Sequence, residues 1–421
     1  MNKALRTLLA DDERLGFPPS EDPREEEAVS MTRQKALKTL PRWREVMSRG
    51  GKRSEGSWSY VESNKRRVKK LLRCGIPNEL RGQVWRDISG CSKRLANDTG
   101  TYRALLELHQ DIDETFDQDI RMDLARTFPT HELFQPNGIA IPGLQRVLRA
   151  FCWRFPAMGY CQSLNYIAGL FLILMSEEEA FWMLSTLVED ILPGQFYSTS
   201  LTGLRVEQEV FNRLLELKLP DLARHFEELG VNTSMFVCSW FLRLYMDVLP
   251  LQTTLRVWDC LFYEGPKVLH RVALAILASQ ESELLALDSP GPIMHHLNQT
   301  VQSLFNHKAF MKSALSLRFN RRFLQVEREK ARSFVRDETE ELNRRREEVS
   351  YRKASSNTEE TPSAGANVAA VDEDRESFGS DLNSSTDSPV PTAPLHALCA
   401  VSLQNHLDTL LPQGVMAQMA S

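Results

Sequence analysis

The sequence has few cysteines, and no two of them form a CxxC motif. Seven are scattered along the 421 residues, and their number is odd. A disulfide framework or a structural zinc site needs patterned cysteines, so we expect neither, and no metal site of another kind is indicated. Unpatterned cysteines are typical of reduced thiols in a cytosolic protein, which predicts a cytoplasmic location. They are Cys74, Cys91, Cys152, Cys161, Cys238, Cys260 and Cys399.

A long apolar run is also missing. The longest one, Leu164–Met175, contains Asn165, whereas a membrane-spanning helix needs about 20 apolar residues. The start of the chain, Met1–Arg14, has no apolar region of signal-peptide length. We therefore expect any contact with a membrane, endomembranes included, to be peripheral.

The charge of the chain is close to balanced. It carries 51 basic and 56 acidic residues, a net charge of -5. No strong positive field favours nucleic acid, which is therefore not an expected partner. Hydrophobic residues make up 42% of the chain, a proportion typical of a globular protein with a sizeable core.

Helical periodicity dominates the middle of the chain, and the alternation typical of strands is scarce. From Gly75 to about Phe310 one short helix pattern follows another, separated by proline or glycine and without a heptad register. This pattern predicts an all-α fold with one large helical domain over residues 61–315. We expect residues 1–60 to be mostly a disordered arm, with a short helix at Met31–Met47 that Pro41 interrupts.

Three further segments are distinguished by their charge. Glu62–Arg73 predicts a basic helix, which we interpret as a solvated lead-in, with contact to acidic lipid or an acidic partner as the alternative. Residues 316–352 predict a long charged helix with too few apolar positions for a coiled coil. Residues 353–421 predict a disordered acidic tail, because the stretch Ala354–Ser421 has nine acidic residues and one basic residue.

The chemistry concentrates between residues 111 and 162. Asp123 and Arg126 are three residues apart, so on a helix they share a face and can touch. Pro129 disfavours helical geometry at Phe128, which predicts a helix end near Arg126. Gln162 precedes an apolar run with helical spacing, which places it near the start of a buried helix.

Three short motifs occur in order along the chain. They are RxxxW at Arg81 and Trp85, IxxDxxRTFP at Ile120, Asp123, Arg126, Thr127, Phe128 and Pro129, and YxQ at Tyr160 and Gln162. In this order they are specific, and the chain resembles the TBC (Tre-2/Bub2/Cdc16) family over roughly residues 65–310. One departure is Ser163, where that family usually has glycine.

The resemblance implies a GTPase-activating protein rather than an enzyme with its own substrate pocket. Its partner would be a Rab-family small GTPase in the GTP form, and it would have no cofactor of its own, because GTP and Mg²⁺ belong to the partner. Arg126 would be an arginine finger and Gln162 a glutamine finger that orients water. Asp123 would hold Arg126, Tyr160 would pack near Gln162, and Thr127 would bond locally. The motif residues Arg81 and Trp85 would hold the first helix of the domain against the finger helices.

Two alternatives remain open at this point. The chain could be a catalytically silent TBC scaffold that binds a small GTPase or another trafficking partner; the presence of both finger residues argues against it. It could also be a helical hydrolase that uses Cys161 or a histidine, although no local motif places a base beside that thiol. The sequence leaves open which Rab would be bound and which oligomeric state the protein has.

Overall fold

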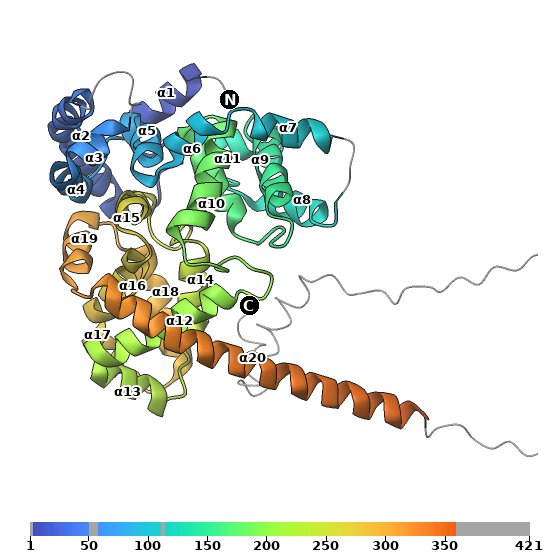
Figure 1. The fold of residues 1–421 in the computed structure, drawn as a ribbon. Coiled ribbons are helices and arrows are strands. Elements are labelled where there is room, and N and C mark those ends of the chain that lie inside the picture. The colour runs from blue at the N-terminus through green and yellow to red at the C-terminus, as the bar shows by residue number, and fades with distance from the viewer. Residues whose placement is uncertain (1–2, 50–57, 111–113, 359–421) are drawn as a thin grey trace, which may run out of the picture. The chain divides into compact units, whose positions relative to one another are not determined.

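The computed structural model describes residues 3–49, 58–110 and 114–358 (Figure 1). Within these ranges all regular structure is helical and no strand occurs, so the predicted all-α class is confirmed. The chain divides into a compact unit over residues 1–335 and a second unit over residues 336–421. Every site discussed below lies in the first unit.

The first group of helices in this unit extends to residue 191. Its members are α1 (Lys3–Asp11), α2 (Pro23–Ser48), α3 (Ser59–Ser63), α4 (Lys65–Cys74), α5 (Asn78–Ser89), α6 (Cys91–Asn97), α7 (Thr101–Leu108), α8 (Asp117–Arg126), η2 (Glu132–Phe134), α9 (Ile141–Arg154), α10 (Leu164–Leu174), α11 (Glu177–Thr186) and η3 (Leu187–Ile191).

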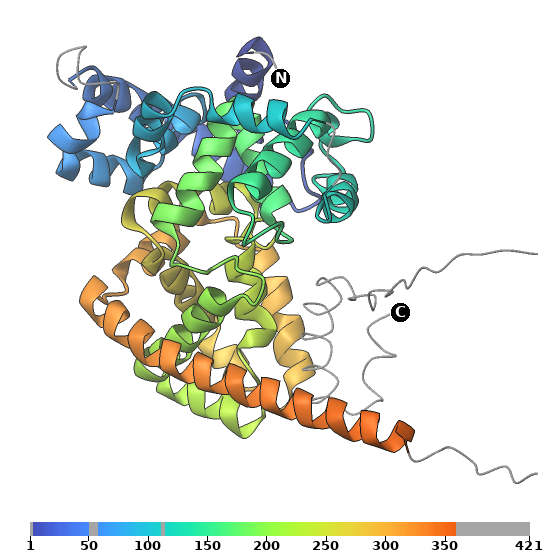
Figure 2. The same cartoon turned by 45° about the vertical axis from the view of Figure 1, so that its right-hand side comes forward.

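A second group follows. It consists of α12 (Thr202–Lys218), α13 (Pro220–Glu228), α14 (Ser234–Leu242), α15 (Leu251–Glu264), α16 (Lys267–Ser279), α17 (Glu281–Leu285), α18 (Pro290–Gln302), α19 (His307–Ser316) and α20 (Arg321–Thr358). The first group lies at one end of the unit and most of the second group at the other, with α15 of the second group between them (Figures 1 and 2); α20 belongs to this unit only as far as residue 335. The buried aromatic side chains of α15 join the groups through contacts described next.

Four aromatic rings form the packing centre around α15. Trp85 of α5 packs against Trp258 and Phe262 of α15, at 5.7 and 5.0 Å between ring centroids. Phe171 of α10 contacts the same α15 rings and also Trp85, at 6.3 Å. Such pairs add about 0.5–1.5 kcal/mol each beyond the burial of their area. The cluster fixes α10, and therefore the segment just before it, against the rest of the body.

The prediction that residues 1–60 are mostly a disordered arm is wrong for most of that stretch. Residues 3–11 and 23–48 are helical, and Leu15 between them is fully buried. Pro23 stands at the first helical turn, where its missing N–H costs nothing, and the Asp22 side chain caps α2. Burial of apolar side chains such as Leu15 stabilises this region although its composition is polar.

Pro41 does not interrupt α2 as expected. The helix continues through it to Ser48, although an internal proline removes one backbone hydrogen bond. Trp43 and Val46 follow directly and are both fully buried. The indole N–H of Trp43 also donates to the carbonyl oxygen of Gly75 at 2.9 Å. Packing beyond the proline therefore holds the helix together.

The basic segment predicted as one helix forms two, α3 and α4, with a break at Asn64. It is also less solvated than expected. Lys69 and Arg73 both pair with the buried carboxylate of Glu264. Part of the positive charge of α4 is thus neutralised by a buried carboxylate instead of facing solvent.

The charged helix after residue 316 is α20, which runs to Thr358. Its first part is not simply solvated, because Leu324, Ala331 and Val335 are buried. Of the tail predicted to be disordered, residues 353–358 still belong to α20, and residues 359–421 lie outside the described residues.

Candidate functional site

Helix α8 ends at Arg126, as the proline rule predicted. Thr127 leaves the helical region of φ/ψ space, and Phe128 adopts a positive φ of 47° before Pro129. The side chain of Arg126 is 48% exposed. The turn therefore presents the long, positively charged side chain of Arg126 to solvent where α8 ends and the loop begins.

Asp123 links two of the predicted site residues. Its Oδ1 accepts a hydrogen bond from Nε of Arg126 at 2.7 Å, and its Oδ2 accepts one from the hydroxyl of Tyr160. The carboxylate is 6% exposed, so water competes little for these bonds. Burial, reinforced by the negative charge of Asp123, raises the pKa of Tyr160 well above its ordinary value, which keeps the phenol protonated and able to donate.

Gln162 lies beside Arg126 although the two are far apart in sequence. With its carboxamide oxygen turned toward the guanidinium, Gln162 accepts hydrogen bonds from both terminal nitrogens of Arg126, the Nη1 contact at 2.8 Å. Both side chains are exposed. As predicted, Gln162 stands just before a buried helix, α10. The guanidinium of Arg126 and the carboxamide of Gln162 therefore lie next to each other on the surface.

The backbone between Gln162 and α10 is unusual. Ser163 has φ 90° and ψ -20°, a left-handed conformation that glycine adopts far more readily. This is the position where a glycine would be usual in the family that the sequence resembles. Here the turn is made by a serine, which is 3% exposed.

Thr127 is fully buried and bonds locally as expected. Its hydroxyl donates to the backbone oxygen of Asp123 at 2.7 Å and accepts from the side-chain nitrogen of Asn165 at 2.8 Å. The hydrogen bond between Asn165 and Thr127 links the end of α8 to the first turn of α10. Asn165 therefore fixes the relative position of the two segments that carry Arg126 and Gln162.

Tyr166 is a site residue that the sequence reasoning did not single out. Its hydroxyl donates to the backbone oxygen of Arg126 at 3.3 Å, and the guanidinium of Arg243 lies 5.5 Å from its ring centroid. Its position in the first turn of α10, shortly after Gln162, was the available signal. The ring supports the end of α8 from the α10 side.

Arg81 and Trp85 converge on Asp259 of α15 rather than on the finger helices as expected. Arg81 Nε and Trp85 Nε1 lie 3.1 and 2.9 Å from Oδ1 of Asp259. Burial opposes ionisation, but the charges of Arg81 and Arg256 hold the pKa of Asp259 below its ordinary value. Only the ring of Trp85 reaches α10, through Phe171. The RxxxW motif thus joins α5 to α15.

His131 is buried and has two bonding partners. Nε2 lies 3.0 Å from the backbone oxygen of Leu15, and Nδ1 accepts the backbone N–H of Leu133 at 3.2 Å. Burial lowers the pKa of His131. The neutral ring with its proton on Nε2 satisfies both bonds, so this residue is structural. The thiol of Cys161 donates to the carbonyl oxygen of Gln162 at 3.5 Å.

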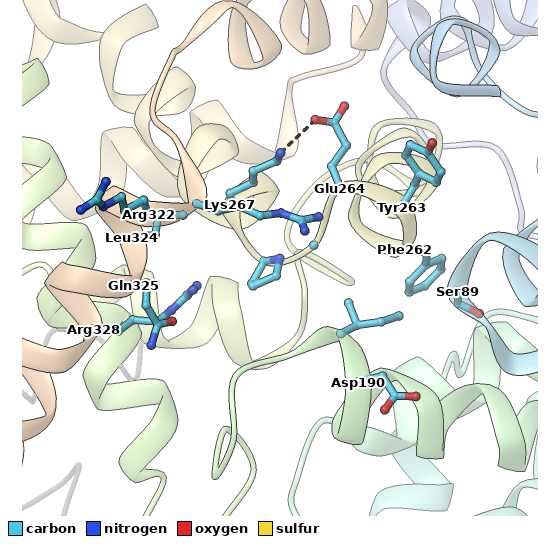
Figure 3. A pocket seen from close by; sticks show the side chains of 14 residues that line it. Ser89, Asp190, Phe262, Tyr263, Glu264, Lys267, Arg322, Leu324, Gln325 and Arg328 are labelled. Atoms are coloured by element: carbon cyan, nitrogen blue, oxygen red, sulfur yellow. Dashed lines mark ion pairs between the residues drawn. The ribbon is translucent and has the colours of Figure 1, made fainter. Parts of the chain in front are cut away.

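A pocket of about 530 Å³ lies elsewhere on this unit. Figure 3 shows Glu264 and Lys267 pairing at its wall, 3.4 Å apart. Neither Arg126 nor Gln162 lines it, so the exposed pair lies outside this pocket. Its lining consists of Ser89, Asp190, Ile191, Phe262, Tyr263, Glu264, Gly265, Pro266, Lys267, Arg321, Arg322, Leu324, Gln325 and Arg328.

The described residues contain no group of three or more histidine, cysteine or acidic side chains able to hold a metal ion. Within the same part of the chain, none of the helices combines the length and the apolar character needed to cross a bilayer.

Comparison with known proteins identifies the family and the fold of the chain. A family model described as Rab-GTPase-TBC domain matches residues 78–285. The crystal structure of a flagellar RabGAP TBC domain from Chlamydomonas is similar at a TM-score of 0.62 and 31% identity, covering 71% of this chain and 97% of that one. The Ypt/Rab-GAP domain of Gyp1p, at 22% identity and a TM-score of 0.52, shares the fold.

Similar full-length proteins include the growth hormone-regulated TBC protein 1 of Xenopus tropicalis, 41% identical over 53% of this chain and 66% of its own length. The human TBC1 domain family member 2A is 38% identical over 59% of this chain and 27% of its own length. The chain thus matches less than two thirds of either relative. The predicted family is nonetheless confirmed over nearly the whole length of the Chlamydomonas domain, and the chain belongs to the Rab-GTPase-TBC domain family.

Proposed function

We propose that this chain accelerates GTP hydrolysis by a Rab-type small GTPase and completes the partner's active site with Arg126 and Gln162. The family to which the chain belongs activates GTPases. One observation supports the roles proposed for Arg126 and Gln162. The two side chains lie next to each other and are exposed, Arg126 at the end of α8 and Gln162 in the loop before α10.

The chemistry requires a cation and an oriented water. Negative charge spreads over the phosphoryl oxygens as GTP is hydrolysed, and an arginine supplied in trans is worth about 10³–10⁵ in rate. That corresponds to roughly 4–7 kcal/mol of barrier. Arg126 would donate to these oxygens, and its planar fork suits them better than a lysine ammonium. The partner supplies GTP and Mg²⁺, and this chain supplies no cofactor.

Preorganisation of Arg126 supports the proposal. Nε and Nη2 of Arg126 both pair with Oδ1 of Asp123, at 2.7 and 2.5 Å, and with its oxygen turned toward the guanidinium, Gln162 accepts from the terminal nitrogens Nη1 and Nη2. On docking, we propose that those nitrogens exchange the Gln162 oxygen for phosphoryl oxygens and that the freed carboxamide binds the attacking water. A guanidinium already held by a buried carboxylate loses less conformational freedom at that moment.

Asp123, Tyr160 and Thr127 would act through the two fingers rather than on the nucleotide. Arg81 and Trp85 would maintain the fold through Asp259. We also propose a cytoplasmic location, with any contact to endomembranes peripheral, because activation needs only the surface that meets the GTPase.

The test is single-turnover hydrolysis by a panel of GTP-loaded Rab GTPases. At least one Rab should be accelerated by the wild-type chain, and Arg126→Ala and Gln162→Ala should each lose most of the acceleration. Arg224→Ala is a matched control, because this exposed arginine also pairs with an acidic residue three positions away. If no Rab responds, the proposal is wrong. Tight binding of a GTP-loaded Rab without acceleration would select the silent scaffold instead.

A further inference from the structure

The segment Asp12–Phe17, here called the strap, packs against the turn that follows Arg126. The strap lies ahead of residue 78, where the match to the family model begins. The ring of Phe17 contacts the ring of Phe128 edge to face, with centroids 5.0 Å apart, and that of His131 at 4.6 Å. Nothing in the sequence pattern of residues 1–30 predicted this contact.

The strap is fastened to three separate elements. The side chains of Asn78 in α5 and Gln252 in α15 donate to the backbone oxygens of Asp12 and Glu13. His131 lies 3.0 Å from the backbone oxygen of Leu15, whose side chain is fully buried. These bonds join the strap to both helices of the RxxxW contact and to the loop after α8.

The strap also closes on itself. The Asp12 carboxylate accepts the backbone N–H groups of Arg14 and Gly16 at 3.0 and 2.9 Å. Gly16 has φ 85°, and a Cβ atom there would come within 2.6 Å of Leu9 and 3.1 Å of His131. The positive φ and these close neighbours both favour glycine at position 16. The turn at Gly16 therefore fixes the position of Phe17.

Phe128, which Phe17 touches, has a backbone conformation that depends on its surroundings. It holds a positive φ, 47°, two residues after Arg126. A non-glycine residue keeps such a conformation only when its surroundings enforce it. Its ring is enclosed by Phe17, by Phe134 at 5.4 Å and by Tyr166 at 5.6 Å. Gly169 of α10 leaves room for it, since a Cβ there would lie 3.0 Å from the ring.

We infer that the strap is a positioning element for Arg126, with Phe17 as its contact residue. This inference rests on the proposed function. Phe17 is one of three rings packed around Phe128, with Phe134 and Tyr166. The left-handed turn at Phe128 comes directly after the end of α8 and so influences where Arg126 points. Removing the ring lets the turn relax toward ordinary backbone geometry. A displacement of about 1 Å at a catalytic group can cost about 100-fold in rate.

The first test needs no partner. Hydrogen exchange is measured at the amides of Thr127, Phe128, Thr130 and His131 in wild type, Phe17→Ala and Phe17→Leu. Exchange should accelerate at least about 10-fold in Phe17→Ala and return toward wild type in Phe17→Leu. Phe305→Ala is the control, because Phe305 is buried at 9% exposure and has no ring contact with Phe128. Unchanged exchange in Phe17→Ala, or equal acceleration in Phe305→Ala, would overturn the inference.

The second test uses a Rab that the panel identifies. Phe17→Ala should bind the Rab loaded with a GTP analogue as wild type does, but bind the Rab loaded with GDP and aluminium fluoride, which imitates the transition state, about 10- to 100-fold more weakly. Phe17→Leu should restore most of the loss. Equal weakening of both complexes would show a general fold effect and contradict positioning, as would no weakening. If Arg126→Ala itself binds the aluminium fluoride complex like wild type, the proposed function fails, whatever the exchange data show for the strap.

Discussion

In the amide orientation that satisfies both groups, with its oxygen turned toward the guanidinium, the side-chain oxygen of Gln162 lies 2.8 Å from Nη1 of Arg126. The two residues come from segments that are separated in sequence by all of α9. Under the proposed function, this pairing occupies guanidinium nitrogens that a phosphoryl group would bind. A phosphoryl group would displace the Gln162 oxygen, since charge-assisted bonds to phosphate are stronger than bonds to a neutral amide.

Asp123→Asn should reduce the stimulation of GTP hydrolysis by about 10- to 100-fold, because the neutral amide no longer anchors Arg126 and Tyr160 by charge. Binding of the GTP-loaded Rab should change little. Single-turnover rates against Rab concentration separate the two effects. Asp221→Asn, on an exposed pair with Arg224, is the control, and an undiminished maximal rate for Asp123→Asn would remove that residue from the mechanism.

Asp259→Asn should lower the free energy of unfolding by about 3–5 kcal/mol, since Arg81 and Arg256 would be left charged and buried without a carboxylate. Urea unfolding measures this. An exposed carboxylate gives the comparison: Glu216→Gln, which breaks a solvated pair with Arg213, should cost no more than about 1 kcal/mol. Equal costs for the two changes would mean that the RxxxW contact is not structural.

Glu207 should make stability depend on acidic pH. Burial opposes its ionisation, but hydrogen bonds from Arg328 and His270 lower its pKa from 4.5 to about 2. Because the folded value is the lower one, its contribution is fully present above pH 4.5 and is lost as the pH falls toward 2. The total is about 3 kcal/mol. In urea titrations, the stability gap between wild type and Glu207→Gln should narrow below pH 4.5; a gap that widens there would contradict the assigned pKa.

Ser163→Gly should raise the free energy of unfolding by about 1 kcal/mol. The left-handed backbone costs a non-glycine residue about 1–3 kcal/mol, whereas glycine loses about 0.5–1 kcal/mol through its greater freedom in the unfolded chain. Ser289→Gly, at a helix cap with φ -156°, should bring no gain. Stimulation of GTP hydrolysis should survive in Ser163→Gly, and a loss of stability there would show that the serine side chain is needed.

Local rules predicted the local features of the site. Pro129 fixed the end of α8, and the spacing of Asp123 and Arg126 gave their contact. The sequence did not predict that Arg81 would meet Asp259, or that Phe17 would pack on Phe128, because tertiary packing decides both. The polar composition of residues 1–30 suggested disorder, whereas a few apolar side chains such as Leu15 are sufficient to dock that region.

The central claim is that Arg126 acts on a partner's nucleotide. Its most direct test is the single-turnover rate of GTP hydrolysis by a responsive Rab at saturating wild-type chain, Arg126→Ala and Arg126→Lys. The account predicts that both variants lose at least about 1,000-fold of the stimulation, while each still folds with wild-type stability. Full stimulation by Arg126→Ala would contradict it.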